Sequence, residues 1–250
     1  MKVVLTIAGS DTSAGAGIQQ DLKTITALGQ YGATVITAIT AQNTLGVQGV
    51  QPVSREMVYQ QIRSVMDDLD VRAIKIGMLP NREVAIAIVE RLSKMKEPIP
   101  VVWDPVMIST SGTRLMAEDC IEYLQEYLVP YCTLITPNLP ESELFEPPYR
   151  TNMLIKGGHA EGEEMTDTLI LANGDKFSFT EHKIDSTNLH GTGCTLSSAI
   201  ATYLAMDYQL PEAVHRAKSY LTEAIRAGQN QHIGQGNGPL GVMTSFKPDH

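Results

Sequence analysis

Short apolar runs alternate with amphipathic segments along almost the whole chain. Val3–Ala8 is a continuous apolar run, which is typical of a strand that is buried on both faces of a parallel sheet. In the segment that follows, Ile18, Leu22 and Ile25 recur at helical spacing and predict an amphipathic helix over 18–28. The same alternation predicts further strands over 34–40, 73–78, 99–106, 133–136 and 153–156, and further helices over 54–69, 82–95, 120–128, 195–206 and 212–227.

This alternation of strands and helices predicts an α/β fold with a central, mainly parallel sheet and helices on both of its faces. Asn173-Gly174 separates two short apolar segments, 169–171 and 176–179, and predicts a hairpin at the edge of that sheet. A chain of 250 residues suits one large domain, so we expect residues 1–250 to form a single unit. Ligands of such folds bind at the carboxyl ends of the strands.

Composition narrows the class of partner. Lys and Arg total 19 against 28 Asp and Glu, which gives a formal net charge of -9, and no basic run is present. Nucleic acid is therefore an unexpected partner, and an acidic protein that handles anionic substrates must concentrate positive potential locally. The three cysteines form no CxxC pair, which fits a reducing compartment. The first apolar run is too short for a signal peptide, so we expect a cytoplasmic protein with no membrane partner.

A glycine turn precedes the helix predicted near the C-terminal end, in the stretch HGTGCTLSSAIATYLA that begins at His190. Gly191 and Gly193 permit a tight backbone, and the N–H groups at a helix start favour a phosphate or an oxyanion. Cys194 stands in this field, where its thiolate would be favoured. The position could supply a base, a nucleophile or only a small buried side chain.

The first strand leads into a second glycine loop, GSDTSAGAG, at residues 9–17. The loop lacks the third glycine of a dinucleotide fingerprint, and Lys23-Thr24 comes too late for a Walker loop. A flexible first turn that merely needs small residues is the simpler alternative.

Polar side chains follow several of the predicted strands. Asp104 ends one strand before a proline, and Asn138 and Glu141 follow the next in TPNLPESEL. Magnesium in nucleotide sites takes one or two carboxylates together with phosphate oxygens and water. Lys156 offers the local positive charge that a triphosphate needs, and the Gln42 amide can both donate to and accept from a heterocycle. Each residue alone is equally compatible with a turn, a solvated lysine or a structural glutamine.

Seven stretches, taken together and in order, resemble the hydroxymethylpyrimidine/phosphomethylpyrimidine kinases of thiamin synthesis. They are IAGSDTSAGAGIQQDLKT, TAITAQNTLGV, AIKIGML, VVWDPVM, LITPNLPESEL, IKGGH and HGTGCTLSSAIA. AQNT and HGTGC together separate this group from the sugar kinases of the same ribokinase-like fold. The resemblance implies an αβα sandwich, commonly dimeric, that phosphorylates the hydroxymethylpyrimidine and then its monophosphate with ATP and magnesium. The expected partners are therefore the pyrimidine, ATP and a second copy of the chain.

The resemblance also implies roles for individual residues. Gln42 would hydrogen-bond the pyrimidine, in a pocket whose walls would be Gly9, Asp21, Met78 and Val106. Asp104 and Glu141 would hold magnesium, while Asn138 and Lys156 would meet the nucleotide and its phosphates. The transferring phosphoryl group would lie in the turn formed by Gly191, Thr192 and Gly193. Cys194 beside it would act as a general base or hydrogen-bond acceptor on the substrate hydroxyl, without forming a phosphocysteine.

The chain departs from the family pattern in three places. Ala14 replaces a glycine in the first loop, the segment 145–152 is short where relatives carry an extra helix, and the tail from Gly236 onward differs. Three other functions stay open at this point. They are a pyridoxal or pyridoxine kinase of the same fold, a cysteine hydrolase that pairs Cys194 with His190 or His159, and a vitamin-precursor binding protein without turnover.

Overall fold

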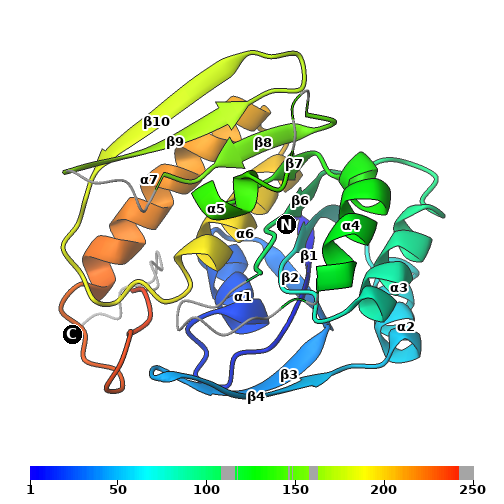
Figure 1. The fold of residues 1–250 in the computed structure, drawn as a ribbon, viewed down its shortest axis with the longest axis horizontal. Coiled ribbons are helices and arrows are strands. Elements are labelled where there is room, and N and C mark those ends of the chain that lie inside the picture. Colours follow the sequence, from blue (N-terminus) through cyan, green and yellow to red (C-terminus); the bar gives the residue numbers. More distant parts are fainter. Residues whose placement is uncertain (108–115, 117, 146, 148, 158–162, 242–250) are drawn as a thin grey trace.

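The computed structural model describes the chain except for residues 108–115, 117, 146, 148, 158–162 and 242–250. In the described part, an eight-stranded sheet has the order β10-β9-β8-β7-β6-β5-β1-β2 (Figure 1). Its strands are β1 Val3–Ala8, β2 Tyr31–Ile36, β5 Val71–Ile76, β6 Val101–Trp103, β7 Leu134–Ile135, β8 Asn152–Ile155, β9 Glu164–Ile170 and β10 Lys176–His182. The helices are α1 Gly17–Ala27, α2 Arg55–Met66, α3 Arg82–Leu92, α4 Glu118–Tyr127, α5 Leu139–Ser142, α6 Thr192–Ala205 and α7 Leu210–Gly228, with a 3-10 turn at Val129–Tyr131.

The sheet is parallel from β2 to β8. At one edge, β9 pairs antiparallel with β8, and β10 pairs antiparallel with β9. The hairpin predicted at Asn173-Gly174 joins these two edge strands, and Gly174 has a φ of 95° that glycine adopts without strain. The central parallel strands end at one side of the sheet, so the loops after β1, β5, β6, β7 and β8 meet there.

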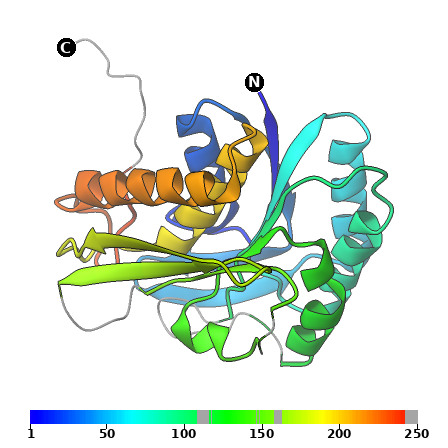
Figure 2. The same ribbon diagram turned by 90° about the horizontal axis from the view of Figure 1, so that it is seen from above.

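Two hydrophobic cores lie on opposite faces of the sheet because neighbouring strand residues point to opposite sides. Leu5 packs into the core that α2, α3 and α4 cover, whereas Val4 packs into the core beneath α1, α6 and α7. Val102 and Trp103 divide between the two cores in the same way. Figure 2 shows the two groups of helices on either side of the sheet. The predicted αβα sandwich with a mainly parallel sheet is confirmed.

The strand predicted over 34–40 is wrong as a single element. The chain leaves the main sheet at Thr37, whose N–H donates to the Ala8 carbonyl over 2.9 Å and whose Oγ1 donates to the Met78 carbonyl over 2.8 Å. Beyond this point β3, Ala38–Asn43, pairs antiparallel with β4, Gly46–Pro52, as a separate two-stranded hairpin. The strand β4 is rich in Gly and Gln and mostly exposed, so its sequence carries no apolar signal.

Helix starts agree with the sequence at one place and differ at another. Ser54, the first residue of the helix predicted over 54–69, caps α2 by accepting from the Met57 N–H over 3.3 Å. The helix predicted from residue 195 instead begins at Thr192, with Gly191 as its N-cap. Cys194 therefore lies inside the first turn of α6. None of the helices in the described ranges has the length and apolar character needed to cross a membrane.

Candidate active site

A cavity of about 270 Å³ opens where the parallel strands end. Its walls come from the loops after β1, β5, β6, β7 and β8, from β3, and from the first turn of α6. The structure thus gathers almost every residue that the sequence singled out. The predicted residues that line the cavity are Gly9, Gln42, Met78, Asp104, Val106, Asn138, Glu141, Lys156, Gly191, Thr192, Gly193 and Cys194.

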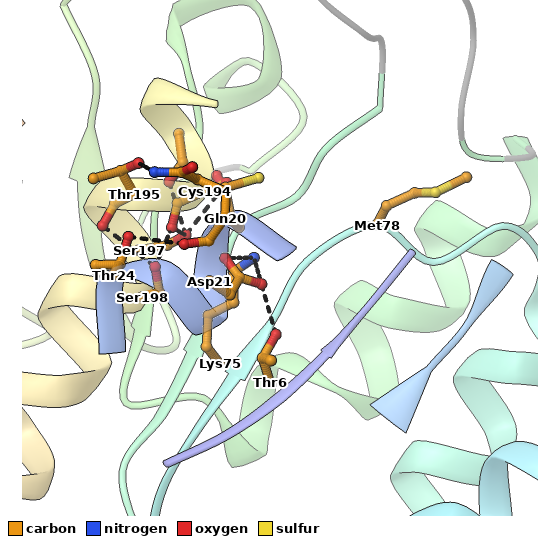
Figure 3. Close-up of polar contacts among 12 residues, drawn as sticks. Thr6, Gln20, Asp21, Thr24, Lys75, Met78, Cys194, Thr195, Ser197 and Ser198 are labelled. Atoms are coloured by element: carbon orange, nitrogen blue, oxygen red, sulfur yellow. Dashed lines mark hydrogen bonds and ion pairs between the residues drawn. The ribbon is translucent and has the colours of Figure 1, made fainter. Parts of the chain in front are cut away.

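The exception is Asp21, and its predicted place in the pocket wall is wrong. Asp21 is fully buried in α1, and both of its carboxylate oxygens accept from Lys75 Nζ, at 2.9 and 2.8 Å (Figure 3). Thr6 Oγ1 adds a third hydrogen bond, of 2.6 Å. Asp21 therefore acts through Lys75, which itself lines the cavity.

Lys75 is a cavity residue that the sequence analysis did not single out. It sits in β5 with no exposed surface, and a lysine is almost never fully buried without a charged partner. Burial by itself lowers the pKa of this ammonium, but the Asp21 carboxylate raises that pKa above its usual range. Burial raises the pKa of Asp21 despite the opposing effect of Lys75. A lysine within the otherwise apolar run AIKIGM was the signal that could have identified it.

Asp104 and Lys156 form the second ion pair of the cavity. Lys156 Nζ donates to Asp104 Oδ1 over 2.7 Å, and Thr136 Oγ1 donates to the same oxygen over 3.0 Å. Burial alone would raise the pKa of Asp104, but Lys156 and then Lys75 hold it below its usual value. Within the described ranges, the hydrogen-bond partner of the other oxygen, Oδ2, is Ser197 Oγ at 3.5 Å. This oxygen keeps the capacity to bind a cation.

Glu141 lies close to this pair at the start of the short helix α5. Asn138 and Glu141 form a capping box, in which Glu141 Oε2 accepts from the Asn138 N–H over 2.9 Å and Asn138 Oδ1 accepts from the Glu141 N–H over 2.8 Å. Burial raises the pKa of Glu141, Lys156 opposes this, and Asp104 adds to it. Two neighbouring carboxylates that repel one another are a natural place for a divalent cation.

The turn at Gly191–Cys194 is fixed by backbone geometry. Gly191 has a φ of 88°, and a Cβ at this position would overlap the Gly15 carbonyl oxygen of the first glycine loop. A Cβ on Gly193 would lie 3.2 Å from Asp104 Oδ2. Gln20 of α1 donates to Thr195 Oγ1 over 2.9 Å and holds the start of α6 in place (Figure 3). Glycine is needed here for a close approach, and the turn that begins α6 lines the cavity, where a helix start favours an anion.

Cys194 is a thiol at neutral pH, so the predicted thiolate is wrong for the resting protein. Burial raises the pKa of Cys194 to about 11, and although Lys75 lowers the pKa, the carboxylates of Asp21 and Asp104 raise it again. Desolvation and the two nearby negative charges therefore outweigh the effect of the helix start, which favours the thiolate.

The first glycine loop is organised by Asp11, a residue that the sequence analysis also passed over. Its carboxylate accepts from the N–H and Oγ of Ser13 and from the N–H groups of Gly15 and Ala16, over 2.7 to 3.0 Å. His190 Nε2 lies 2.8 Å from Asp11 Oδ2. Burial alone would raise the pKa of Asp11, but the hydrogen bonds from His190 and Ser13 lower it to about 2. An aspartate within a run of small residues was the available signal.

Two of the departures from the family pattern, Ala14 and the segment 145–152, can be described in the structure. Ala14 adopts a φ of 61°, a conformation in which glycine is the usual residue. In the short segment, Phe145 packs edge-on against Trp103, with ring centroids 6.0 Å apart.

The geometry does not support a cysteine hydrolase. His190 directs its Nε2 toward Asp11 and Gln42, and a nucleophilic cysteine needs a lowered pKa, whereas that of Cys194 is raised. His159, the other proposed partner, lies outside the described residues. An anion-binding turn, two cavity lysines and two carboxylates at strand ends are instead the requirements of phosphoryl transfer. Fold and site together define a small-molecule kinase of the ribokinase-like class.

Comparison with known proteins agrees with this assignment to the ribokinase-like kinases. The family model described as phosphomethylpyrimidine kinase matches residues 11–152 and 148–241, two segments that meet within the short stretch before β8. A hydroxymethylpyrimidine/phosphomethylpyrimidine kinase from Rhizobium meliloti is 46% identical over 258 residues, which cover 95% of this chain and 96% of that protein. The chain belongs to the phosphomethylpyrimidine kinase family and is a phosphotransferase.

Two solved structures show the same relationship. The crystal structure of phosphomethylpyrimidine kinase from Clostridium difficile is 42% identical, with a TM-score of 0.77 over 90% of this chain and 100% of that one. The pyridoxal kinase from Staphylococcus aureus in complex with AMP-PCP and pyridoxal is 30% identical, with a TM-score of 0.86 over 100% of this chain and 96% of that one.

Proposed function

We propose that this protein uses magnesium-ATP to phosphorylate 4-amino-5-hydroxymethyl-2-methylpyrimidine, and then the resulting monophosphate, in thiamin biosynthesis. The observation that carries the proposal is that one cavity brings two sets of residues together. The Gln42 amide and the apolar Met78 and Val106 suit a small heterocycle, and we assign them to a pyrimidine end. The Gly191–Cys194 turn and Lys156 suit phosphate, and we assign them to a phosphate end.

The pyrimidine end recognises its ligand through few polar groups. Gln42 is the side chain of β3 that can pair with a ring nitrogen and an adjacent amino group at the same time. Gly9 lets the Met78 side chain pack beside the first loop, because a Cβ at this position would lie 2.7 Å from the Met78 sulfur. Asp21 acts on this end through its hydrogen bonds with Lys75.

The phosphate end binds the nucleotide and stabilises the charge of the transferring group. The turn of Gly191, Thr192 and Gly193 at the start of α6 holds the transferring phosphoryl group, and Lys156 and Asn138 meet the nucleotide phosphates. Lys156 stays charged there: burial alone lowers its pKa, but Asp104 and Glu141 raise it above the usual range.

The carboxylates fit a magnesium ion. Asp104 Oδ2 and Glu141 Oε1 are hard oxygen donors whose protein contacts are long, at 3.5 and 3.4 Å. No described cluster of three or more His, Cys, Asp or Glu side chains is placed to hold a metal, so phosphate oxygens and water would complete the coordination. When bound, the ion would neutralise charge on the phosphates.

The chain itself positions the reacting groups and manages one proton. The primary hydroxyl of the pyrimidine attacks the γ-phosphorus in line, the bond to the β–γ bridging oxygen breaks, and ADP leaves. Direct transfer of this kind needs no covalent enzyme intermediate. Cys194 faces the hydroxyl and accepts its proton when the thiol is ionised.

We further infer that residues 1–250 form one kinase domain that acts as a cytoplasmic homodimer. Ile39, Leu45 and Val50 of the β3–β4 hairpin are exposed apolar side chains, which are available for association. The molar mass of the purified protein in solution, measured by light scattering, tests the dimer.

A turnover assay tests the main proposal. Incubation of the protein with magnesium-ATP and the hydroxymethylpyrimidine should yield the monophosphate first and the diphosphate later. If no monophosphate forms at saturating magnesium-ATP, the proposal fails. If the monophosphate accumulates without diphosphate, only the second step is lost.

The second candidate is a pyridoxal or pyridoxine kinase. The likeness to the Staphylococcus aureus pyridoxal kinase favours it, since the two folds superpose over this whole chain. A parallel assay with B6 vitamers separates the two activities: kcat/KM should be higher for the pyrimidine.

Gln42→Leu is expected to weaken pyrimidine binding by about 1 to 3 kcal/mol, because a buried polar edge of the ligand is left unpaired. ATP affinity should stay unchanged, and calorimetry measures both. Gln51→Leu, at an exposed position of the same hairpin, is the matched control. Unchanged pyrimidine affinity together with weaker ATP binding would place Gln42 at the wrong end of the cavity.

A further inference from the structure

His190 faces the pyrimidine end of the cavity with one ring nitrogen that touches two groups. Its Nε2 lies 2.8 Å from Asp11 Oδ2 and 3.3 Å from Gln42 Nε2. The side chain is 12% exposed, and the ring packs against Gly15, where a Cβ would collide with it. The ring thus connects the first glycine loop to the amide that is proposed to recognise the substrate.

The contact with Asp11 fixes the proton on this nitrogen. The Asp11 carboxylate already accepts four other donors, from Ser13, Gly15 and Ala16, so both of its oxygens act as acceptors. An acceptor at 2.8 Å requires an N–H on His190, whether the ring is neutral or charged. His190 Nε2 is therefore a donor.

A donor on His190 in turn fixes the orientation of the Gln42 amide. An N–H group cannot face the amide nitrogen of Gln42, which also carries only hydrogens. The carbonyl oxygen and the amino group of a glutamine exchange places by a half-turn of the amide. The one hydrogen on His190 Nε2 goes to Asp11, the shorter contact, but the Gln42 carbonyl at 3.3 Å is attracted to this polar N–H, whereas the Gln42 amino group would face it with hydrogens of its own. The carbonyl therefore belongs on the His190 side.

A second contact leads independently to the same arrangement. Thr40 Oγ1 lies 2.9 Å from the Ser10 carbonyl and 3.3 Å from the other end of the Gln42 amide. Its single hydrogen goes to the shorter contact, with the Ser10 carbonyl, which leaves a lone pair toward Gln42. The Gln42 amino group therefore belongs on the Thr40 side.

We propose that His190, held by Asp11, fixes the Gln42 amide in one orientation and is thereby a specificity-determining residue that selects an aminopyrimidine over its oxo counterpart. A 4-aminopyrimidine offers a ring-nitrogen acceptor beside an amino donor, and the 4-oxo form offers a ring N–H donor beside a carbonyl acceptor. A glutamine free to turn over could match either pattern. A fixed amide matches one, so the site discriminates between them. This inference rests on the proposed function.

The experiment compares kcat/KM for 4-amino-5-hydroxymethyl-2-methylpyrimidine and for its 4-oxo analogue, with magnesium-ATP and the full chain. His190→Phe keeps a ring of similar size without the N–H, His190→Gln restores an N–H at the same reach, and Thr40→Val removes the second contact. We expect His190→Phe to lower the amino-to-oxo ratio by about 10-fold or more, mostly through KM for the two pyrimidines. His190→Gln should stay within about 3-fold of the wild-type ratio, and Thr40→Val should shift the ratio in the same direction as His190→Phe. His182→Phe, on the exposed edge strand β10, is the matched control.

The outcomes separate the two proposals. A ratio that is unchanged in both His190→Phe and Thr40→Val overturns the inference and leaves the kinase intact. So does an equal loss on both pyrimidines that His190→Gln does not rescue, since this indicates a purely structural ring. Because Thr40→Val leaves the Asp11 loop in place, a poorly folded His190→Phe does not block the test. Wild-type protein that phosphorylates neither pyrimidine overturns the proposed function, and the inference with it.

Discussion

Replacing Cys194 with alanine is expected to lower turnover about 10²-fold at neutral pH, with little effect on ATP affinity. General base catalysis contributes about 10²- to 10⁴-fold. The pKa of Cys194, about 11, leaves most of the protein as thiol at neutral pH, so the expected loss lies at the lower end of that range. Steady-state kinetics at saturating substrates measure it. Cys120→Ala, which changes a buried cysteine of α4 outside the cavity, is the matched control.

The pH dependence of turnover tests the same role in a second way. Below a pKa of about 11, the thiolate fraction of Cys194 rises about tenfold for each pH unit, so wild-type turnover should increase from pH 7 to pH 9. Cys194→Ala has no group to ionise and should be flat over this range. Cys194→Asp should recover part of the activity, because the ordinary pKa of a carboxyl group lies several units below that of a thiol.

Two results would contradict this account of Cys194. Near wild-type turnover in Cys194→Ala across the pH range would mean that the cysteine only fills space beside the turn. A phosphocysteine trapped during turnover and seen in intact-protein mass spectra would mean that transfer is not direct.

The sandwich could be predicted because a strand that is buried on both faces appears in the sequence as a continuous apolar run. Val3–Ala8 is such a run, and the structure places this strand within the same bounds. The β3–β4 hairpin could not be predicted in the same way, because it packs little apolar surface and begins where Thr37 turns the chain away from the sheet. That departure depends on contacts with Ala8 and Met78, which are distant in sequence.

The site was predicted best where a residue acts from the end of its own strand. Asp104 and Lys156 are examples, since parallel strand ends meet at one edge whatever the detailed packing. Lys75 and Asp11 were missed, and His190 was considered only as a hydrolase partner of Cys194, because the contacts that make these residues important lie far along the chain. The same reason explains the error for Cys194: the helix start is visible in the sequence, but the burial and the neighbouring carboxylates that raise its pKa are not.

Lys75→Met is expected to lower the free energy of unfolding by about 3 to 5 kcal/mol, because it leaves the Asp21 carboxylate buried without its partner. Both side chains have no exposed surface, and Nζ lies 2.8 Å from the nearer Asp21 oxygen. Methionine has nearly the length of lysine, so packing changes little. Urea denaturation measures the loss. Lys218→Met breaks the buried pair with Asp167, at 2.8 Å, and is the matched control for the loss of a buried ion pair outside the cavity.

The double variant Lys75→Met/Asp21→Leu separates charge burial from packing. Removing both charges should restore most of the stability lost in Lys75→Met, because the penalty arises from one unpaired carboxylate. The alkaline rise of turnover should move to higher pH in Lys75→Met, because Lys75 lowers the pKa of Cys194, and Lys218→Met should not produce this change. In the double variant the rise should return toward its wild-type position, because the Asp21 carboxylate, which raises the pKa of Cys194, is lost as well. If the double variant remains as unstable as Lys75→Met, the loss comes from packing, and the buried pair is not what holds this end of the cavity together.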